Sequence, residues 1–116
     1  MIGKIFIKNL LLKTKIGDSE AERSAPQDVL INVSLWTDFA KAIETKNTED
    51  TVDYAYIENG IIRLSEQNEF VLLENLADEI MKMCLSDERI AKVSVKVEKP
   101  GKLKSESVGV EIEQTR

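Results

Sequence analysis

The segment Asp28-Val-Leu-Ile-Asn-Val-Ser-Leu-Trp-Thr37 decides the fold class. Apolar side chains occupy alternate positions in it, and successive side chains of an extended strand point to opposite faces. The alternate apolar positions are Val29, Ile31, Val33 and Leu35. The segment therefore predicts a strand with one face in the core, and with Asn32 and Ser34 on the other face.

Three further segments also predict strands. Lys4–Lys13 is rich in β-branched and aromatic residues, and neither of its faces is strictly polar, which suits cover on both faces, one of them by another subunit. Ile90–Glu98 alternates cleanly, and Ser107–Glu113 resumes the pattern. We expect Lys99-Pro100-Gly101 to break the strand, because proline cannot donate to the ladder and glycine suits a turn.

The middle of the chain predicts helices. Asp53 is placed to cap a helix over Tyr54–Gln67, and a second helix is expected over Val71–Ser86. The second helix has an apolar stripe at steps of three and four residues, made of Leu72, Leu73, Leu76, Ile80, Met83 and Cys84. The polar stretches 16–27 and 44–51 predict a loop and a connector.

The resulting order is β-β-α-α-β-β, an α+β fold. We expect an antiparallel four-stranded sheet with both helices on one face. A chain of 116 residues is of ordinary size for a single domain, here residues 1–116. A chain this short leaves much apolar surface exposed, which favours oligomerisation.

The composition restricts the classes of function. The hydrophobic fraction of 42% and the charged fraction of 32% are typical of a globular protein in water. A net charge of −5 argues against a nucleic-acid partner, and we interpret the dense lysines at positions 92, 96, 99, 102 and 104 as a solvated strand edge. No apolar run is long enough for a membrane span, and the chain starts on a strand-like pattern rather than a signal peptide. The single cysteine, Cys84, fits a reducing compartment, so we expect a cytoplasmic protein without a membrane partner.

The sequence contains no histidine. With no histidine and a single cysteine, a closed zinc site of the usual kind cannot be built, so we expect no metal. A catalytic triad that relies on imidazole is excluded as well. Any proton transfer must therefore use carboxylates, lysine, tyrosine or hydroxyl groups.

A few positions are candidates for chemistry, although each has a plain structural explanation. Glu20 and Glu22 lie in the first loop, where glutamates are usually only solvated. Tyr54 stands at a helix start. Glu74 lies in a first helical turn, where a carboxylate favours the helix dipole by about 0.3–1 kcal/mol. Lys99 ends a strand, where lysine often protects an edge. Taken singly, each position fits a structural role better than a catalytic one.

Read together, these positions resemble the dihydroneopterin aldolases. The segments that carry the resemblance follow in order over nearly the whole chain: Ile16-Gly17 with Glu22 and Gln27, Asp50-Thr-Val-Asp-Tyr54, Phe70-Val-Leu-Leu-Glu74-Asn-Leu-Ala-Asp-Glu79, Val97-Glu-Lys99-Pro-Gly101, and Ser107-Val-Gly-Val-Glu-Ile-Glu113. The resemblance implies a tunnelling fold, in which sheets of several subunits close side by side into a barrel. It also implies a homo-octamer of two stacked tetrameric rings, or a tetramer, with active sites at subunit interfaces.

The resemblance implies a role for each candidate residue. Glu74 matches the residue that anchors the pterin, and a carboxylate suits this role because it accepts two parallel hydrogen bonds from a guanidine-like edge. The backbone near Val52 and Leu73 completes the pocket in the family. Lys99 matches the catalytic lysine, Tyr54 the proton-relaying tyrosine, and Glu22 the loop carboxylate near the reacting side chain.

The implied reaction is a retro-aldol cleavage of 7,8-dihydroneopterin on the route to folate. It gives 6-hydroxymethyl-7,8-dihydropterin and glycolaldehyde. The C=N bond of the dihydropterin ring accepts the electrons, so the reaction requires no cofactor, no metal and no Schiff base. Lys99 then acts as an acid–base group through a water molecule, and Tyr54 helps to protonate the enol-like intermediate.

Two rivals share this fold. The dihydroneopterin triphosphate 2'-epimerases invert a side-chain carbinol instead, and Ile7–Leu10 and Gln27–Val33 look like that group, whereas Lys99-Pro100-Gly101 looks more like the aldolases. The loop Asp18–Ala21 is more acidic than in many relatives, which bears on side-chain selectivity and disfavours a triphosphate. The zinc-dependent cyclohydrolases are excluded, because their cysteine and histidine ligands are missing.

A further alternative is a pterin-binding module without catalysis. Binding alone would require chiefly Glu74, so the joint presence of Glu22, Tyr54 and Lys99 argues for an enzyme.

Overall fold

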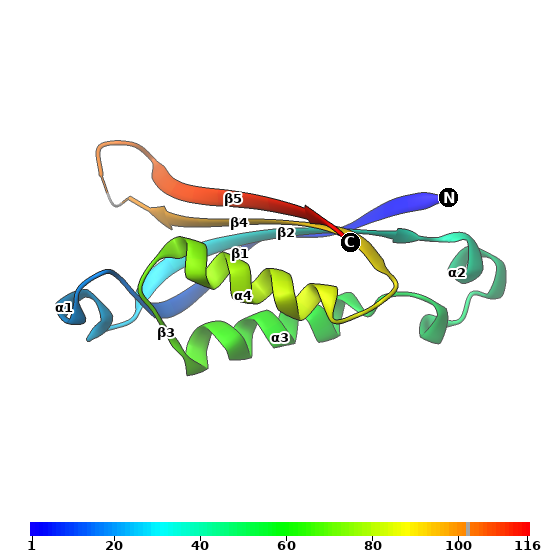
Figure 1. Cartoon of the computed structure of the whole chain (residues 1–116), viewed down its shortest axis with the longest axis horizontal. Helices are drawn as coiled ribbons and strands as arrows, with labels where there is room; N and C mark the ends of the chain where they lie inside the picture. Colours follow the sequence, from blue (N-terminus) through cyan, green and yellow to red (C-terminus); the bar gives the residue numbers. More distant parts are fainter. Residues whose placement is uncertain (102) are drawn as a thin grey trace.

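A computed structural model of the chain describes residues 1–101 and 103–116, so Lys102 of the basic cluster lies outside the described residues. The elements follow in the order β1 (Ile2–Ile16), α1 (Glu20–Arg23), β2 (Gln27–Asp38), α2 (Ala40–Thr45), a 3-10 helix (Thr48–Asp50), α3 (Tyr54–Gln67), β3 (Glu69–Phe70), α4 (Leu73–Leu85), β4 (Ile90–Pro100) and β5 (Ser107–Thr115). Helices α3 and α4 lie on the same face of the sheet (Figure 1). The predicted α+β arrangement is confirmed.

The sheet has five strands in the order β3-β1-β2-β4-β5. The pairs β1–β2, β2–β4 and β4–β5 are antiparallel, whereas β3 pairs in parallel with β1 through Lys15 and Ile16. The expected four-stranded sheet is therefore wrong by one short strand. β3 contains only Glu69 and Phe70, and two residues are too few to show any periodicity in the sequence.

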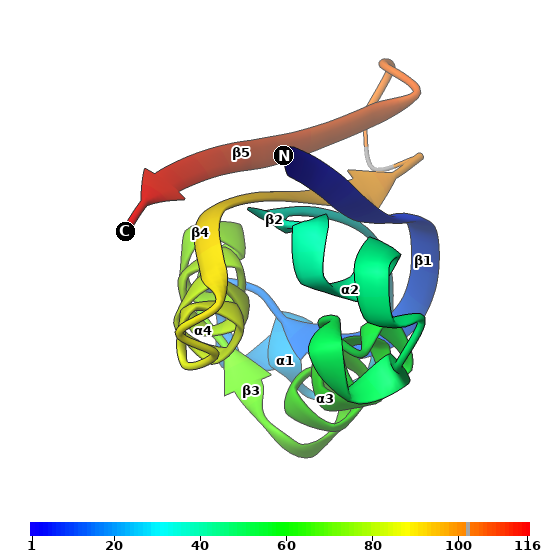
Figure 2. The same cartoon turned by 90° about the vertical axis from the view of Figure 1, so that its right-hand side faces the viewer.

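The core lies between the inner face of the sheet and the two long helices, as the end-on view in Figure 2 shows. The alternating positions predicted on β2 and β4 are all buried: Val29, Ile31, Val33, Leu35, Val93, Val95 and Val97. The helices contribute Ile57, Ile61, Leu76, Ala77, Ile80, Met81 and Cys84. Leu72 departs from the predicted apolar stripe, since it precedes the first turn of α4 and is 46% exposed.

A β-bulge in β1 keeps apolar side chains on the inner face along the whole strand. The register against β2 shifts between Ile7 and Leu10, and Asn9 takes a φ of 56°. Asparagine tolerates this left-handed conformation better than most residues. The Asn9 backbone N–H donates to Asn32 Oδ1 at 2.8 Å, which fixes the bulge. The extra residue explains why Ile7 and Leu10, which are three positions apart, both face the core.

The structure corrects two further expectations. The stretch 44–51, expected to be a polar connector, contains the end of α2 and the 3-10 helix, both too short to show a periodic pattern. Lys99 and Pro100 do not break β4, because Pro100 still pairs with Ser107. The chain turns only at Gly101, whose φ of 64° suits glycine. Proline is tolerated at the last position of a strand, where one missing donor matters little.

The face of the sheet away from the helices is uncovered in the single chain. Phe6 and Leu11 of β1 are 62% and 58% exposed on this face. Trp36 lies beside them, with Lys92 Nζ 4.7 Å and Lys4 Nζ 5.8 Å from its ring centre. No helix in the described part of the chain is both long and apolar enough to cross a membrane.

Candidate active site

Lys99 and Glu22 meet at one end of the molecule. Lys99 lies near the end of β4, and its Nζ is 3.8 Å from Glu22 Oε2. The lysine side chain is only 14% exposed and the glutamate 33%, so the pair is partly shielded from water. The fold thus brings together two residues that are distant in the sequence and that were both expected in the site.

The backbone around Glu22 is held by side chains from its own loop. Gln27 Nε2 donates to the carbonyl of Ile16 at 2.6 Å and to the carbonyl of Glu22 at 3.2 Å, which ties the two ends of the loop together. Arg23 Nη1 donates to the Gly17 carbonyl at 2.7 Å. A Cβ atom at Gly17 would lie 2.3 Å from the Cβ of Glu22, so only glycine fits there.

Glu74 and Leu73 start α4 at the same end of the molecule (Figure 1). The parallel pairing of β3 with β1 brings this helix start close to the loop that carries Glu22, since the Gly17 backbone N–H donates to the Phe70 carbonyl at 3.0 Å. Glu74 is exposed, whereas Leu73 is half-buried against the core. The carboxylate is therefore available to a ligand.

Val52 and Tyr54 lie at the start of α3, at the opposite end of the molecule. Asp53 caps α3 as expected, because its Oδ1 accepts from Ala55 N at 3.0 Å and Tyr56 N at 3.2 Å. Val52 is 2% exposed and Tyr54 is 67% exposed. An open groove of about 670 Å³ is lined by Thr51, Val52, Tyr54 and Arg89, among others. A ligand in this groove would lie against the segment from Thr51 to Tyr54.

Arg89 fixes the position of this second region. Its Nη1 donates to the Thr51 carbonyl at 2.9 Å, and Asp87 grips the other side of the guanidinium at 3.0 and 2.8 Å. The bonds to Arg89 hold the pKa of Asp87 below its usual value, and the bond to Asp87 raises the pKa of Arg89. Arg89 follows the last turn of α4, so Thr51 lies at the C-terminal end of that helix.

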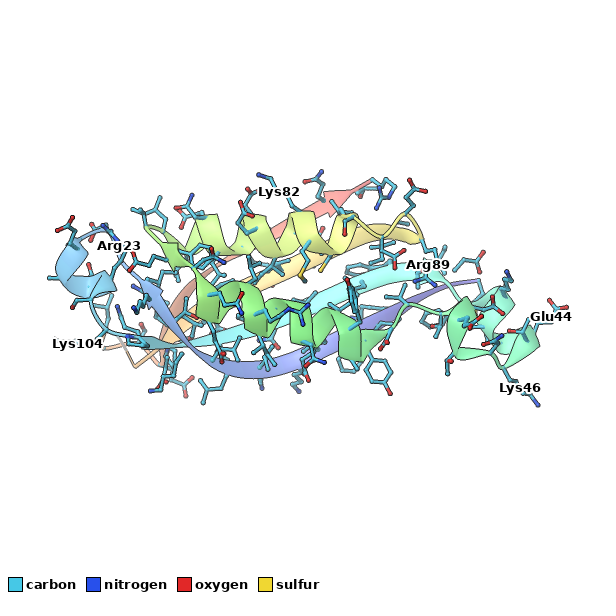
Figure 3. The ribbon with its side chains drawn as sticks, turned by 90° about the horizontal axis from the view of Figure 1, so that it is seen from below. Arg23, Glu44, Lys46, Lys82, Arg89 and Lys104 are labelled. Carbon is cyan, nitrogen blue, oxygen red and sulfur yellow. The ribbon has the colours of Figure 1, made fainter. Side chains whose placement is uncertain are left out.

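The two regions are therefore far apart within one chain. Glu74 is in the first turn of α4, and the 13 residues of the helix span about 20 Å at 1.5 Å per residue. Figure 3 shows the same separation, with Arg23 at one end of the ribbon and Arg89 toward the other. The fold brings Lys99, Glu22, Glu74 and Leu73 to one end and leaves Val52 and Tyr54 at the other.

Some residues that shape the site were missed by sequence reasoning. Gln27 was noted only as part of a motif, and the sequence assigned no role to Arg23 or Arg89. A glutamine ahead of a strand is a weak signal, and an arginine in a polar turn gives none. In the described ranges, no group of three or more histidine, cysteine, aspartate or glutamate side chains is arranged to hold a metal ion.

Comparison with known proteins places this geometry in a family. The family model described as dihydroneopterin aldolase matches residues 5–113. The chain is 36% identical to the dihydroneopterin triphosphate 2'-epimerase of Pseudomonas aeruginosa, over 94% of this chain and 89% of that protein. It is 37% identical to the folic acid synthesis protein FOL1 of Dictyostelium discoideum, and it spans 98% of its own length but only 18% of that longer protein.

Solved structures agree with the sequence comparison. The crystal structure of Escherichia coli dihydroneopterin aldolase in complex with neopterin superposes with a TM-score of 0.91 and 28% identity, covering 97% of this chain and 98% of that one. The fold is therefore that of the dihydroneopterin aldolases. The chain belongs to the dihydroneopterin aldolase family.

Proposed function

We propose that the chain cleaves 7,8-dihydroneopterin by a retro-aldol reaction, giving 6-hydroxymethyl-7,8-dihydropterin and glycolaldehyde in folate biosynthesis. The observation that carries the proposal is the pairing of Lys99 Nζ with Glu22 Oε2 at 3.8 Å beside the start of α4. The family assignment supports it, and the E. coli relative was crystallised with neopterin. The reaction needs an acid–base group near the substrate side chain and an anchor for the ring, and this end of the chain offers both.

The steps follow from the positions of these groups. Glu74 accepts hydrogen bonds from the guanidine-like edge of the pterin, and a bidentate pairing of this kind is strong and directional. Lys99, through a water molecule, removes the proton of the hydroxyl on the side-chain carbon that leaves as the aldehyde. The bond electrons enter the ring through its C=N bond, and glycolaldehyde leaves. Tyr54 helps to return a proton to the carbon left on the ring, which completes the hydroxymethyl group.

This chemistry requires a second copy of the chain, because Tyr54 and Val52 lie about 20 Å from Glu74, judged by the length of α4. We propose that the Val52 end of one subunit completes the Lys99 end of another. The exposed Phe6 and Leu11 support an assembly that covers this face of the sheet. An octamer of two tetrameric rings, in the cytoplasm, is the arrangement that we propose.

Epimerisation is the second candidate, favoured by the 36% identity to the Pseudomonas enzyme. The same C–C cleavage serves it if the aldehyde stays bound, turns its other face to the ring carbon and re-forms the bond. The two activities can therefore coexist in one site, and the lifetime of the bound aldehyde decides their balance.

A product assay tests the proposal. Purified, chelator-treated protein is incubated with 7,8-dihydroneopterin or its triphosphate, and the products are separated by chromatography. Release of 6-hydroxymethyl-7,8-dihydropterin without added metal supports the aldolase. Epimer alone, or activity confined to the triphosphate, assigns the chain to the epimerases, and binding without any conversion would make it a pterin-binding module.

A further inference from the structure

Arg89 joins two segments that the sequence separates. It stands in the turn between α4 and β4, and its Nη1 donates to the carbonyls of Thr51 at 2.9 Å and Glu49 at 3.4 Å. Its Nε and Nη2 donate to the two carboxylate oxygens of Asp87 at 3.0 and 2.8 Å. The guanidinium is thus held in one orientation by a forked ion pair while it grips the backbone ahead of Val52. Lysine could not make this set of bonds, because it lacks the planar fork.

The segment held by Arg89 lines the groove at the start of α3. Val52 as a whole residue is only 2% exposed, and it lines the groove between the half-buried Thr51 and the exposed Tyr54. The segment is fixed on both sides, by Arg89 at Thr51 and by the Asp53 cap at the start of α3. A peptide held in this way is ready to form hydrogen bonds without further ordering, which lowers the entropic cost of binding.

We propose that Arg89 is a positioning residue, which sets the Thr51–Val52 backbone for recognition of the pterin ring. This inference rests on the proposed function, in which the Val52 end of one subunit completes the pterin pocket of another. Arg89 acts through the two carbonyls that it holds and not by touching the substrate. Its loss should therefore weaken ring binding more than it slows the chemical step at Lys99.

Arg116 provides the matched control. It binds the same turn, with its Nε 2.8 Å from the Ile90 carbonyl and its Nη2 donating to the carbonyls of Asp87 and Leu85. Both arginines therefore stabilise the α4–β4 turn, but Arg89 also reaches across to residues 49 and 51. A merely structural role predicts the same behaviour for the two residues, whereas a positioning role predicts different effects on ligand affinity.

The experiment compares Arg89→Ala, Arg89→Lys and Arg116→Ala with the wild-type protein. Neopterin affinity is measured by titration calorimetry. The kcat is measured with saturating 7,8-dihydroneopterin, and the Tm by calorimetric melting. We expect both Arg89 variants to bind neopterin about tenfold more weakly while kcat changes little, because a ring contact that is equally strong in the ground state and the transition state contributes to binding and not to kcat. Arg116→Ala should lower Tm and leave the affinity unchanged. Hydrogen exchange of residues 49–54 should accelerate in the Arg89 variants only.

Distinct results separate the two hypotheses. Wild-type affinity in Arg89→Ala, or an equal loss in Arg116→Ala, would overturn the positioning role and leave the proposed function standing. If the wild-type protein neither binds neopterin nor converts dihydroneopterin, the proposed function is wrong, and the role of Arg89 in pterin binding is wrong with it.

Discussion

The two ends of the molecule are built in different ways. At the Lys99 end, reactive side chains gather from a strand end, a loop and a helix start, and hydrogen bonds from Gln27 and Arg23 to backbone carbonyls hold the loop. At the Val52 end, the backbone on both sides of a buried valine is fixed by Arg89 and by a helix cap. The first end offers titratable groups and the second offers main-chain hydrogen bonds and a tyrosine, so neither end alone is a complete site for the proposed reaction.

The difference teaches why a subunit of this size works as part of an assembly. Helices α3 and α4 run antiparallel along the sheet, so the start of one and the start of the other lie at opposite ends (Figure 1). The proposed ring anchor, Glu74, lies in the first turn of α4, and the proposed backbone contact at Val52 lies just ahead of α3. A single ligand can contact both regions only if they come from two different subunits.

The largest effect is expected from Lys99→Ala. Removing a positioned acid–base group should lower kcat about a thousandfold, within the range seen for such catalysis. Neopterin binding should remain, because the ring anchor at Glu74 is untouched. Steady-state kinetics and calorimetry measure the two quantities. The control is Lys104→Ala, an exposed lysine in the connection that follows β4, which should behave as wild type. Turnover close to wild type in Lys99→Ala would remove lysine from the mechanism.

Glu74→Ala should act on binding instead. The carboxylate is proposed to accept paired, charge-assisted hydrogen bonds, and losing them should weaken neopterin binding about a hundredfold. Glu79→Ala removes an exposed glutamate of the same helix and should bind normally. Calorimetric titration decides between the variants. Unchanged affinity in Glu74→Ala would show that the ring is held elsewhere. The Lys99 end would then have no assigned anchor for the ring.

Mixed assemblies test whether the two ends meet between subunits. Lys99→Ala damages one end and Tyr54→Phe the other, so co-expression should create some sites with two intact halves. Random pairing of equal amounts in a symmetric ring gives about a quarter of wild-type activity. The matched control mixes Lys99→Ala with Glu22→Gln, two defects at the same end, which should regain nothing. No recovery in the first mixture would mean that Tyr54 does not serve a neighbour's site.

Much of the fold could be predicted from the sequence, because burial imposes a period. The alternation from Val29 to Leu35 specifies which face of β2 is inside, and Asp53 caps α3 as its position indicates. β3 and α2 escaped prediction, because elements of two and six residues are too short for a periodic signal.

The candidate site was only partly predictable for a different reason. Sequence distance does not report on spatial distance: Lys99 contacts Glu22, far away in the chain, whereas Tyr54 is separated from Glu74 by the length of a helix. The role of Arg89 depends on carbonyls that lie close only after folding. Contacts of this kind follow from topology and cannot be recovered from residue type.

The smallest expected effect is a loss of stability at the Val52 end at low pH. Hydrogen bonds from Arg89 lower the pKa of Asp87 below its ordinary value of 3.8, so the folded chain favours the charged carboxylate. A depressed pKa means that the stabilisation is fully present above pH 3.8 and is lost as the pH falls through the lower folded-state value. Asp87→Asn should therefore unfold at lower urea concentration than wild type near neutral pH. The difference between the urea concentrations at which the two proteins unfold should shrink as the pH falls below 3.8, the pKa of the free carboxyl group.

Urea melts across this acid range measure the effect, with Glu88→Gln, the exposed neighbouring carboxylate, as the matched control. The effect is modest because the Arg89 side chain is 49% exposed and solvent screens the pair. Hydrogen exchange adds the local view: in acid, residues 49–54 should lose protection before the loop at Glu22, since only the first segment depends on Asp87. Simultaneous loss at both ends would show that the two regions are stabilised as one unit, and that Arg89 does not control the Val52 end separately.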